Sequence, residues 1–279
     1  QLLLDPGDTL IVTFPAFQGL YETARALSCN VKFWELKFEN NFVPDLHELQ
    51  DLMDDRTRLV VVNTPHNPTG KIIPMEMVQQ VQGLCRQWGA TLLLDEHYRF
   101  LPLDGSNRTL PSAVTLGEEV IGTGSIVKCF GLMGLRMGWM IAPHDLLDKS
   151  RDFKDYLTHT LSPISDFLSV QALRSREAIL EKHRRSLKEN ISLLHQWMDA
   201  HGEYFGWIPP EGGVVSYPRI RFDLSADRFC QDLIDREGVF LLPASSFEME
   251  GFVRLGFGIP HRDFSEALER LGRYVTRTF

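Results

Sequence analysis

The chain has 279 residues, of which 43% are hydrophobic, so it can bury a large core in one big domain or two unequal ones. Its net charge of −8 argues against a general nucleic-acid or anionic-membrane surface, because both require clustered positive charge. No apolar run is long enough to cross a bilayer, the four cysteines form no Cys-x-x-Cys, and the nine histidines form no His-Glu-x-x-His. We therefore expect a cytoplasmic protein without a disulfide framework or a metal site.

In the first half of the chain, short apolar runs alternate with helical patterns. The runs predict strands over residues 9–14, 31–38, 59–63, 91–95, 120–124 and 139–142. The helical patterns predict helices over residues 16–28, 45–53 and 74–88. Asp45 caps the second helix and Gly89 follows the third. Strands separated by helices predict an α/β fold with a mostly parallel sheet that carries helices on both faces.

From about residue 166 the pattern changes. A long helical stretch is predicted over residues 166–201, followed by a helix over 226–237, strands over 239–242 and 252–257, and a final helix over 263–276. This order is typical of a smaller α+β domain attached to a long connecting helix. We therefore expect a large domain over residues 1–165, and the connecting helix with a small C-terminal domain over residues 166–279.

Three polar motifs stand out. Asn63-Thr-Pro-His-Asn67-Pro-Thr-Gly70 and Asp95-Glu-His-Tyr98 each begin at the end of a predicted strand. In parallel sheets, ligands bind outside the carboxyl ends of strands, so both motifs are expected at one edge of the sheet. The third motif runs from Gly124 to Trp139, with a serine three residues before a lysine and an arginine eight residues after it.

The lysine of the third motif, Lys128, lies between Val127 and Phe130 with Arg136 downstream. A lysine that forms a Schiff base must spend time uncharged, which apolar neighbours and nearby cations favour. Taken alone, Lys128 would be interpreted as an ordinary surface lysine, and only the flanking pattern favours the Schiff base. Ser125 and Arg136 suit a phosphate, because they offer a hydroxyl donor and a bidentate guanidinium. The alternative for these two is a glycine-rich connection with a structural arginine.

Other polar residues have a similar pair of interpretations. Asp95 ends an apolar strand and needs a cationic partner when buried, although it could be a helix N-cap. Asn67 could belong to a simple turn. Arg254 alternates with apolar residues on a predicted strand, where an arginine requires an anion, either a ligand or a structural partner. Glu96 and His97 are interpreted as structural or supporting residues.

In this order and spacing, the three motifs resemble those of the class I/II aminotransferases, pyridoxal-phosphate enzymes of fold type I, and the resemblance covers nearly the whole chain. It implies a Schiff base between Lys128 and pyridoxal 5′-phosphate, with Lys128 then moving a proton between the substrate α-carbon and the cofactor. It also implies a large cofactor-binding domain, a homodimer, and amino-acid and keto-acid substrates.

The resemblance assigns the remaining roles residue by residue. Ser125 and Arg136 would bind the cofactor phosphate, and Asp95 the protonated pyridine nitrogen. Asn67 and Tyr98 would bond the ring oxygen. Phe17 would stack on the ring, although a core phenylalanine near a helix start is nearly as good an interpretation. Arg254, together with Asn67, would hold the substrate carboxylate.

The chain also departs from the family pattern. The strand, phosphate loop and N-terminal arm that precede the position of Gln1 in the family are absent, so we expect residues 1–165 to be a partial large domain and the activity of this length of chain to be in question. Val214 and Val215 stand where many members carry an aromatic side chain. Residues 213–219 and 155–158 are similar to the capreomycidine-synthase-like branch, which acts on arginine derivatives.

Two alternatives to an aminotransferase stay open. The same first steps serve pyridoxal-phosphate lyases and cyclases. A non-catalytic, aminotransferase-like sensor or fragment could also keep Lys128, Asp95 and Arg136, although regulators of that kind carry a helix-turn-helix domain that this sequence does not contain.

Overall fold

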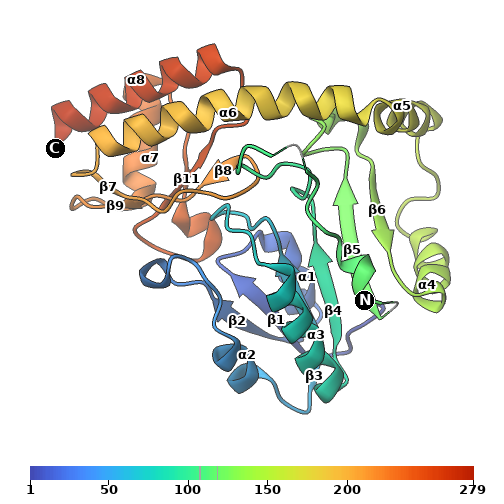
Figure 1. Ribbon diagram of the computed structural model, residues 1–279. Helices are drawn as coiled ribbons and strands as arrows, with labels where there is room; N and C mark the ends of the chain where they lie inside the picture. The colour runs from blue at the N-terminus through green and yellow to red at the C-terminus, as the bar shows by residue number, and fades with distance from the viewer. Residues whose placement is uncertain (107, 118) are drawn as a thin grey trace.

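The computed structural model describes residues 1–106, 108–117 and 119–279, and its centre is a six-stranded sheet (Figure 1). The strands are β1 (Thr9–Phe14), β2 (Asn30–Glu35), β3 (Thr57–Asn63), β4 (Thr91–Asp95), β5 (Val120–Ser125) and β6 (Gly138–Ile141). Their order is β2-β1-β3-β4-β5-β6. All neighbours pair in parallel except β6, which runs antiparallel to β5. The predicted α/β fold with a mostly parallel sheet is confirmed.

Both faces of this sheet carry helices. On one face, α2 (Leu46–Leu52) and α3 (Met75–Trp88) pack in one apolar cluster with Val60 and Val62 of β3. On the other face, α1 (Glu22–Ala26) packs in a second cluster with Leu59 and Val61 of the same strand. Because successive side chains of a strand point to opposite faces, burial on both sides explains why these strands read as nearly continuous apolar runs.

The second half of the chain is mainly helical. It contains α4 (His144–Lys154), α5 (Pro163–Arg174), α6 (Arg176–Ala200), α7 (Ala226–Glu237) and α8 (His261–Thr278). Short strands form two small sheets: β10 (Leu242–Pro243), β11 (Val253–Gly256) and β8 (Val215–Ser216) in one, and β7 (Phe205–Gly206) with β9 (Arg219–Ile220) in the other. Single turns of 3-10 helix are η1 (Gln18–Leu20), η2 (Phe38–Asn40), η3 (Ala113–Leu116), η4 (Met133–Leu135) and η5 (Ala244–Phe247).

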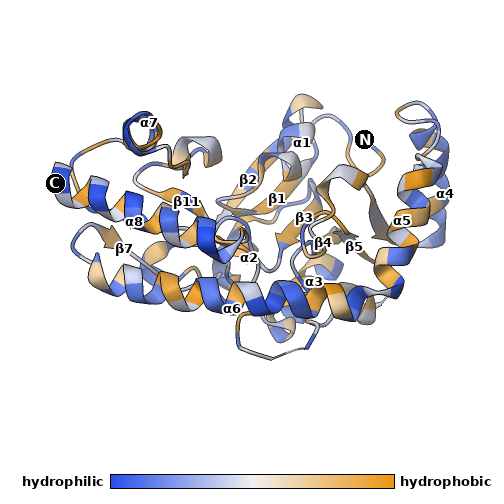
Figure 2. Ribbon diagram, turned by 90° about the horizontal axis from the view of Figure 1, so that it is seen from above, coloured by the Kyte–Doolittle hydropathy of each residue, from blue (hydrophilic) through white to orange (hydrophobic). Residues whose placement is uncertain are grey.

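Helix α6 runs along the molecule from α5 to the small sheets, with α8 beside it (Figures 1 and 2). Its buried side includes Leu180 and Leu187, which share a core cluster with Ile126 and Phe130 from the segment after β5. The third sequence motif is therefore held between the central sheet and α6. In the described part of the chain, no helix combines the length and apolar character that a membrane span requires.

Three predicted elements are wrong in extent. The helix predicted over 16–28 is a 3-10 turn, η1, and the short α1, because Tyr21 between them has an extended φ of −136°. The helix predicted over 166–201 is two helices, because Ser175 leaves helical geometry with ψ of 16°. The strand predicted over 239–242 is reduced to Leu242–Pro243, which pairs with β11. Serine and glycine in these segments lower helix propensity, which helps to explain the first two differences.

Candidate active site

The carboxyl edge of the central sheet is built by three aligned strand ends. Asn63 pairs in register with Asp95, and Asp95 with Thr123. The Asn63 side chain donates from Nδ2 to the Asp95 backbone oxygen at 3.0 Å and accepts at Oδ1 from the Asn67 backbone N–H at 2.6 Å. The loop that carries Asn67 is therefore fixed to the strand that carries Asp95.

Lys128 lies in the connection between β5 and β6, and much of the residue is exposed. Partial desolvation of the Lys128 amine is the main reason that its pKa is lowered, and the nearby guanidiniums of Arg254 and Arg136 lower it further, whereas Asp95 acts in the opposite direction. A lowered pKa makes the neutral, nucleophilic amine more accessible at physiological pH. Lys128 therefore has the electrostatic surroundings expected for an amine that bonds to a carbonyl group.

Asp95 is 8% exposed at the end of β4. Burial raises the pKa of its carboxyl, and this effect is opposed mainly by His97, whose backbone N–H donates to Oδ1 at 3.3 Å, and also by Lys128. A buried carboxylate is stable only when cations or donors surround it. The position suits a cationic ring nitrogen as an additional partner.

Ser125, Gly138 and Arg136 lie where β5 meets β6. Ser125 is buried and pairs in register with Gly138, where a Cβ would lie only 2.9 Å from the Gly124 oxygen. The exposed Arg136 has a left-handed backbone, with φ of 52°. Strained non-glycine residues of this kind cluster at functional sites. A hydroxyl and a guanidinium at adjacent strand ends are suited to an anion.

Arg254 of β11 joins the small sheet to the central one. Its Nη1 donates to the Asn67 Oδ1 at 3.1 Å, and its guanidinium lies 5.4 Å from the centre of the Phe247 ring. Tyr98 and Tyr217 are close enough to Arg254 to interact with its charge. Burial raises the pKa of Tyr98 to about 12, so its hydroxyl stays protonated and can donate a hydrogen bond. This geometry presents a cationic fork beside the cofactor candidates.

Phe17 differs from the other candidates. Its side chain is 55% exposed, and its ring covers Gly19 at the start of η1. It follows β1, so it lies beyond the carboxyl end of that strand, but the described residues provide no contact between Phe17 and the other candidates. The structure thus brings Asn67, Asp95, Tyr98, Ser125, Lys128, Arg136 and Arg254 into one connected region, and leaves Phe17 at its margin.

Three residues of this region were not singled out from the sequence. His97 was interpreted as structural or supporting, yet its ring contacts both Ser125 and Asp95. Tyr217 and Phe247 surround Arg254. For His97 the sequence did hold a signal, since it lies between two candidate residues. Tyr217 and Phe247 are distant in sequence and only the fold brings them in.

The side chains of this region fit the expected cofactor, which has an aldehyde, a phosphate and a basic ring nitrogen. Lys128 offers the amine, Ser125 and Arg136 the anion donors, and Asp95 the carboxylate. Gly213, with φ of 82°, approaches Tyr98 so closely that a Cβ would lie 3.2 Å from the tyrosine Cγ. A larger residue at position 213 would press on Tyr98, which lies between Asp95 and Arg254.

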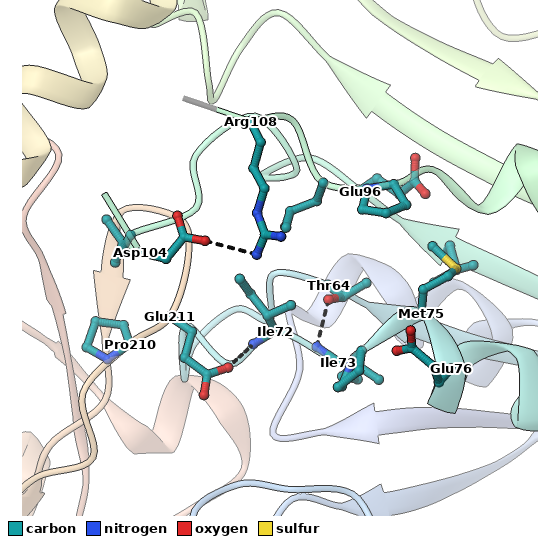
Figure 3. A pocket seen from close by; sticks show the side chains of 15 residues that line it. Thr64, Ile72, Ile73, Met75, Glu76, Glu96, Asp104, Arg108, Pro210 and Glu211 are labelled. Carbon is teal, nitrogen blue, oxygen red and sulfur yellow. Dashed lines mark hydrogen bonds and ion pairs between the residues drawn. The ribbon is translucent and has the colours of Figure 1, made fainter. Parts of the chain in front are cut away.

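A cavity of about 570 Å³ lies beside this region and is a separate feature (Figure 3). None of the candidate residues lines it. Two hydrogen bonds connect residues that line this cavity. The Ile73 N–H donates to Thr64 Oγ1 and the Ile72 N–H donates to Glu211 Oε2, both at 3.0 Å. Glu211 also forms an ion pair with Lys71. These contacts attach the segment before β8 to the loop that carries Asn67.

Comparison with known proteins gives a family match over almost the whole chain. The family model described as aminotransferase class I and II matches residues 1–271. Capreomycidine synthase from Streptomyces vinaceus is 32% identical over 272 residues, which is 96% of this chain and 69% of that protein.

Two solved structures are similar in fold as well as in sequence. A PLP-dependent aminotransferase from Streptococcus suis has a TM-score of 0.93 and 31% identity, with 100% of this chain and 73% of that chain covered. The PLP-dependent cyclase OrfR has a TM-score of 0.90 and 30% identity, with 100% and 74% covered.

Proposed function

The chain belongs to the class I and II aminotransferases, which are pyridoxal-phosphate enzymes, and we propose that Lys128 is the lysine through which it transfers an amino group between an amino acid and a keto acid. The observation that carries this proposal is the set of charges around Lys128. The Lys128 amine interacts with two guanidiniums, Arg136 and Arg254, and with one carboxylate, Asp95. These groups come from three separate segments of the chain.

When bound, pyridoxal phosphate supplies an aldehyde for the amine and a ring that withdraws electrons from the substrate α-carbon. Lys128 would hold the cofactor through Nζ, and its neutral amine would accept the α-proton from the substrate. Asp95 would hold the ring nitrogen in its protonated form. Ser125 and Arg136 would bind the phosphate, and Phe17 would cover the ring.

The substrate side of the proposal rests on Arg254 and Asn67. The guanidinium of Arg254 would take the α-carboxylate bidentately, because its fork matches the two oxygens. Asn67, which already accepts a hydrogen bond from Arg254, would contribute its amide. Tyr98 and Asn67 would hydrogen-bond the ring oxygen of the cofactor, so the loop that carries Asn67 would contact both cofactor and substrate.

We also propose the domain division at residues 165 and 166, with the central sheet in the cofactor-binding part and α6 as the connecting helix. The two small sheets after α6 support this division. A cytoplasmic location is supported by Cys29, Cys85, Cys129 and Cys230, which are all free thiols.

A homodimer is the proposed assembly, and α5 is the surface that supports it. Ile164 and Phe167 of α5 are 71% and 61% exposed, and Leu157 of the preceding segment is 67% exposed. Large exposed apolar patches mark interaction surfaces. Sedimentation should show a dimer that Phe167→Glu weakens, while Glu177→Lys on a charged, exposed part of α6 leaves it intact. A monomeric wild-type chain would refute this proposal.

The test of Lys128 is covalent labelling. The chain mixed with pyridoxal phosphate should develop visible absorbance, and borohydride should fix the cofactor on Lys128, as peptide mass spectrometry would detect. Lys149 and Lys182 serve as internal controls, because they should stay unlabelled. Labelling of another lysine, or unchanged absorbance in Lys128→Ala, would contradict the proposal.

A cyclase is the second candidate, because capreomycidine synthase and the cyclase OrfR are both at or above 30% identity. The two reactions differ in their need for an acceptor. An aminotransferase needs a keto acid to complete its cycle, whereas a cyclase completes its cycle on one substrate. Repeated turnover of an amino acid without added keto acid would favour the cyclase, and turnover that requires the keto acid the aminotransferase.

A further inference from the structure

His97 is the residue that connects the two ends of the candidate cofactor site. Its Nδ1 lies 2.7 Å from the Ser125 Oγ, and its Nε2 lies 3.4 Å from the Asp95 Oδ1. We propose that His97 is a positioning residue that orients the Ser125 hydroxyl toward the cofactor phosphate while its other nitrogen faces Asp95. This inference rests on the proposed function, because it assigns Ser125 to the phosphate.

The backbone holds the imidazole in this position from both sides. The His97 N–H donates to the Asp95 Oδ1 at 3.3 Å. The His97 carbonyl accepts a hydrogen bond at 3.0 Å from the Sγ of the buried Cys129, which follows Lys128. The ring is therefore anchored to β4 and to the lysine segment, and it needs no movement to reach Ser125.

The hydrogen-bonding capacity of a serine hydroxyl explains what this contact does. The hydroxyl has one hydrogen to donate and can accept from other donors. Ser125 Oγ already accepts from the Val127 N–H at 3.3 Å. When His97 Nδ1 also donates to it, the serine hydrogen is free to point at an anion. Without His97, that hydrogen can turn to other acceptors, and the phosphate loses an oriented donor.

The two ring nitrogens of His97 face different groups, Nε2 the Asp95 carboxylate and Nδ1 the Ser125 hydroxyl. Donation to Ser125 requires that Nδ1 carries a hydrogen. Asp95 would thus support the phosphate end of the site through His97, in addition to holding the ring nitrogen.

The two nitrogens can be tested separately with amides. In His97→Asn the side-chain NH₂ can take the place of Nδ1 and keep a donor for Ser125, whereas in His97→Gln it takes the place of Nε2. His97→Phe keeps an aromatic ring without either nitrogen. The ring of His97 is 33% exposed, so these replacements fit without burying a new group. His159→Phe, at an 85% exposed side chain, is the matched control.

The measurement is the dissociation constant of each variant for pyridoxal phosphate and for pyridoxal, which lacks the phosphate, by equilibrium dialysis. His97→Phe should weaken pyridoxal phosphate binding about tenfold, the usual effect of one hydrogen bond to a charged group, and should change pyridoxal binding much less. His97→Asn should restore most of the preference for the phosphate form, and His97→Gln should not. In a Ser125→Ala background, His97→Phe should have little further effect, because contacting residues are not additive.

The outcomes separate the two proposals. If the wild-type chain does not bind pyridoxal phosphate at Lys128, the proposed function fails. If it binds, but His97→Phe weakens both ligands equally or neither, His97 has only a structural role and the inference is overturned. Additive losses in His97→Phe and Ser125→Ala would overturn it as well. Thermal unfolding without cofactor checks that each variant is folded, and His97→Asn, the mildest change, carries the test if His97→Phe unfolds.

Discussion

Gly70 ends the loop that carries Asn67, and its replacement by alanine tests how that loop is held against the segment before β8. Gly70 has φ of 72°, and its carbonyl accepts from the N–H groups of Glu211 and Gly212 at 2.8 and 2.9 Å. A Cβ at this position would overlap the Cβ of Pro210 and lie 2.9 Å from the Val215 oxygen. Two separate penalties follow, one from the backbone and one from the overlap.

Gly89→Ala separates the two penalties, because it carries the backbone penalty without the overlap. Gly89 also has a left-handed backbone, with φ of 66°, but a Cβ there meets nothing within 4 Å. A left-handed alanine costs about 1 kcal/mol, so Gly89→Ala should lower the free energy of unfolding by about that amount. Overpacking against backbone and proline adds about 2–3 kcal/mol, so Gly70→Ala should cost about 3–4 kcal/mol.

Urea denaturation of the wild-type chain and both variants gives the two differences. Gly70→Ala should also weaken pyridoxal phosphate binding, because displacement of its loop moves Asn67, whereas Gly89→Ala at the end of α3 should not. Equal decreases in the free energy of unfolding in the two variants would refute the reasoning, because they would show that the overlap with Pro210 does not destabilise the fold.

Two further predictions concern charge. Arg254→Met should lower kcat/KM for amino acids by an amount that corresponds to about 2–5 kcal/mol of lost transition-state binding. Arg254→Lys should recover only part of this loss, because lysine has no bidentate fork, and both variants should keep the visible cofactor absorbance. Unchanged kinetics would exclude Arg254 from carboxylate binding. Because the pKa of Lys128 in the folded chain is below its ordinary value of 10.5, the charged lysine disfavours folding at neutral pH, and this effect disappears as the pH rises through the folded pKa to above 10.5. Lys128→Met should therefore increase the free energy of unfolding most at pH 7 and least above pH 10.5, and urea denaturation across that range would contradict the assignment if the difference were constant.

The sequence carried most of the information about the central sheet. All six strands were predicted because burial on both faces makes them apolar runs. Asp45, as an N-cap, and Gly89, after a helix end, located two helices. The Asp45 side chain accepts from the His47 N–H at 2.9 Å, as its position as an N-cap required. The small strands of the second half were harder, because β7 to β10 are only two residues long and are defined by their partners rather than by a pattern. Helix α4 was missed because only Leu146 of its 11 residues is buried, which leaves little periodicity to detect.

For the candidate site, local spacing was enough to group Ser125, Lys128 and Arg136, which lie at the end of β5 and in the connection from β5 to β6. It was not enough to find what surrounds them. The contacts of His97 with Ser125, and of Arg254 with Phe247, depend on which strands become neighbours and on which way each side chain turns. No pattern within one segment contains that information. The roles of the individual residues remain predictions that the variants above would test.

The hydrogen bond between Asn67 and Arg254 has a consequence for the order in which the protein becomes functional during synthesis. The two residues are separated by 187 positions, and β11 is the last strand of the chain. Domains are synthesised and folded from the N-terminus, so Lys128, the proposed cofactor lysine, and the central sheet have left the ribosome while Arg254 is still to be added. Arg254, the proposed carboxylate ligand, is thus the last of the candidate site residues to be synthesised. If Arg254 holds the substrate carboxylate as proposed, a nascent chain that stops short of β11 contains Lys128 but cannot hold an amino acid, and substrate binding requires synthesis past residue 254.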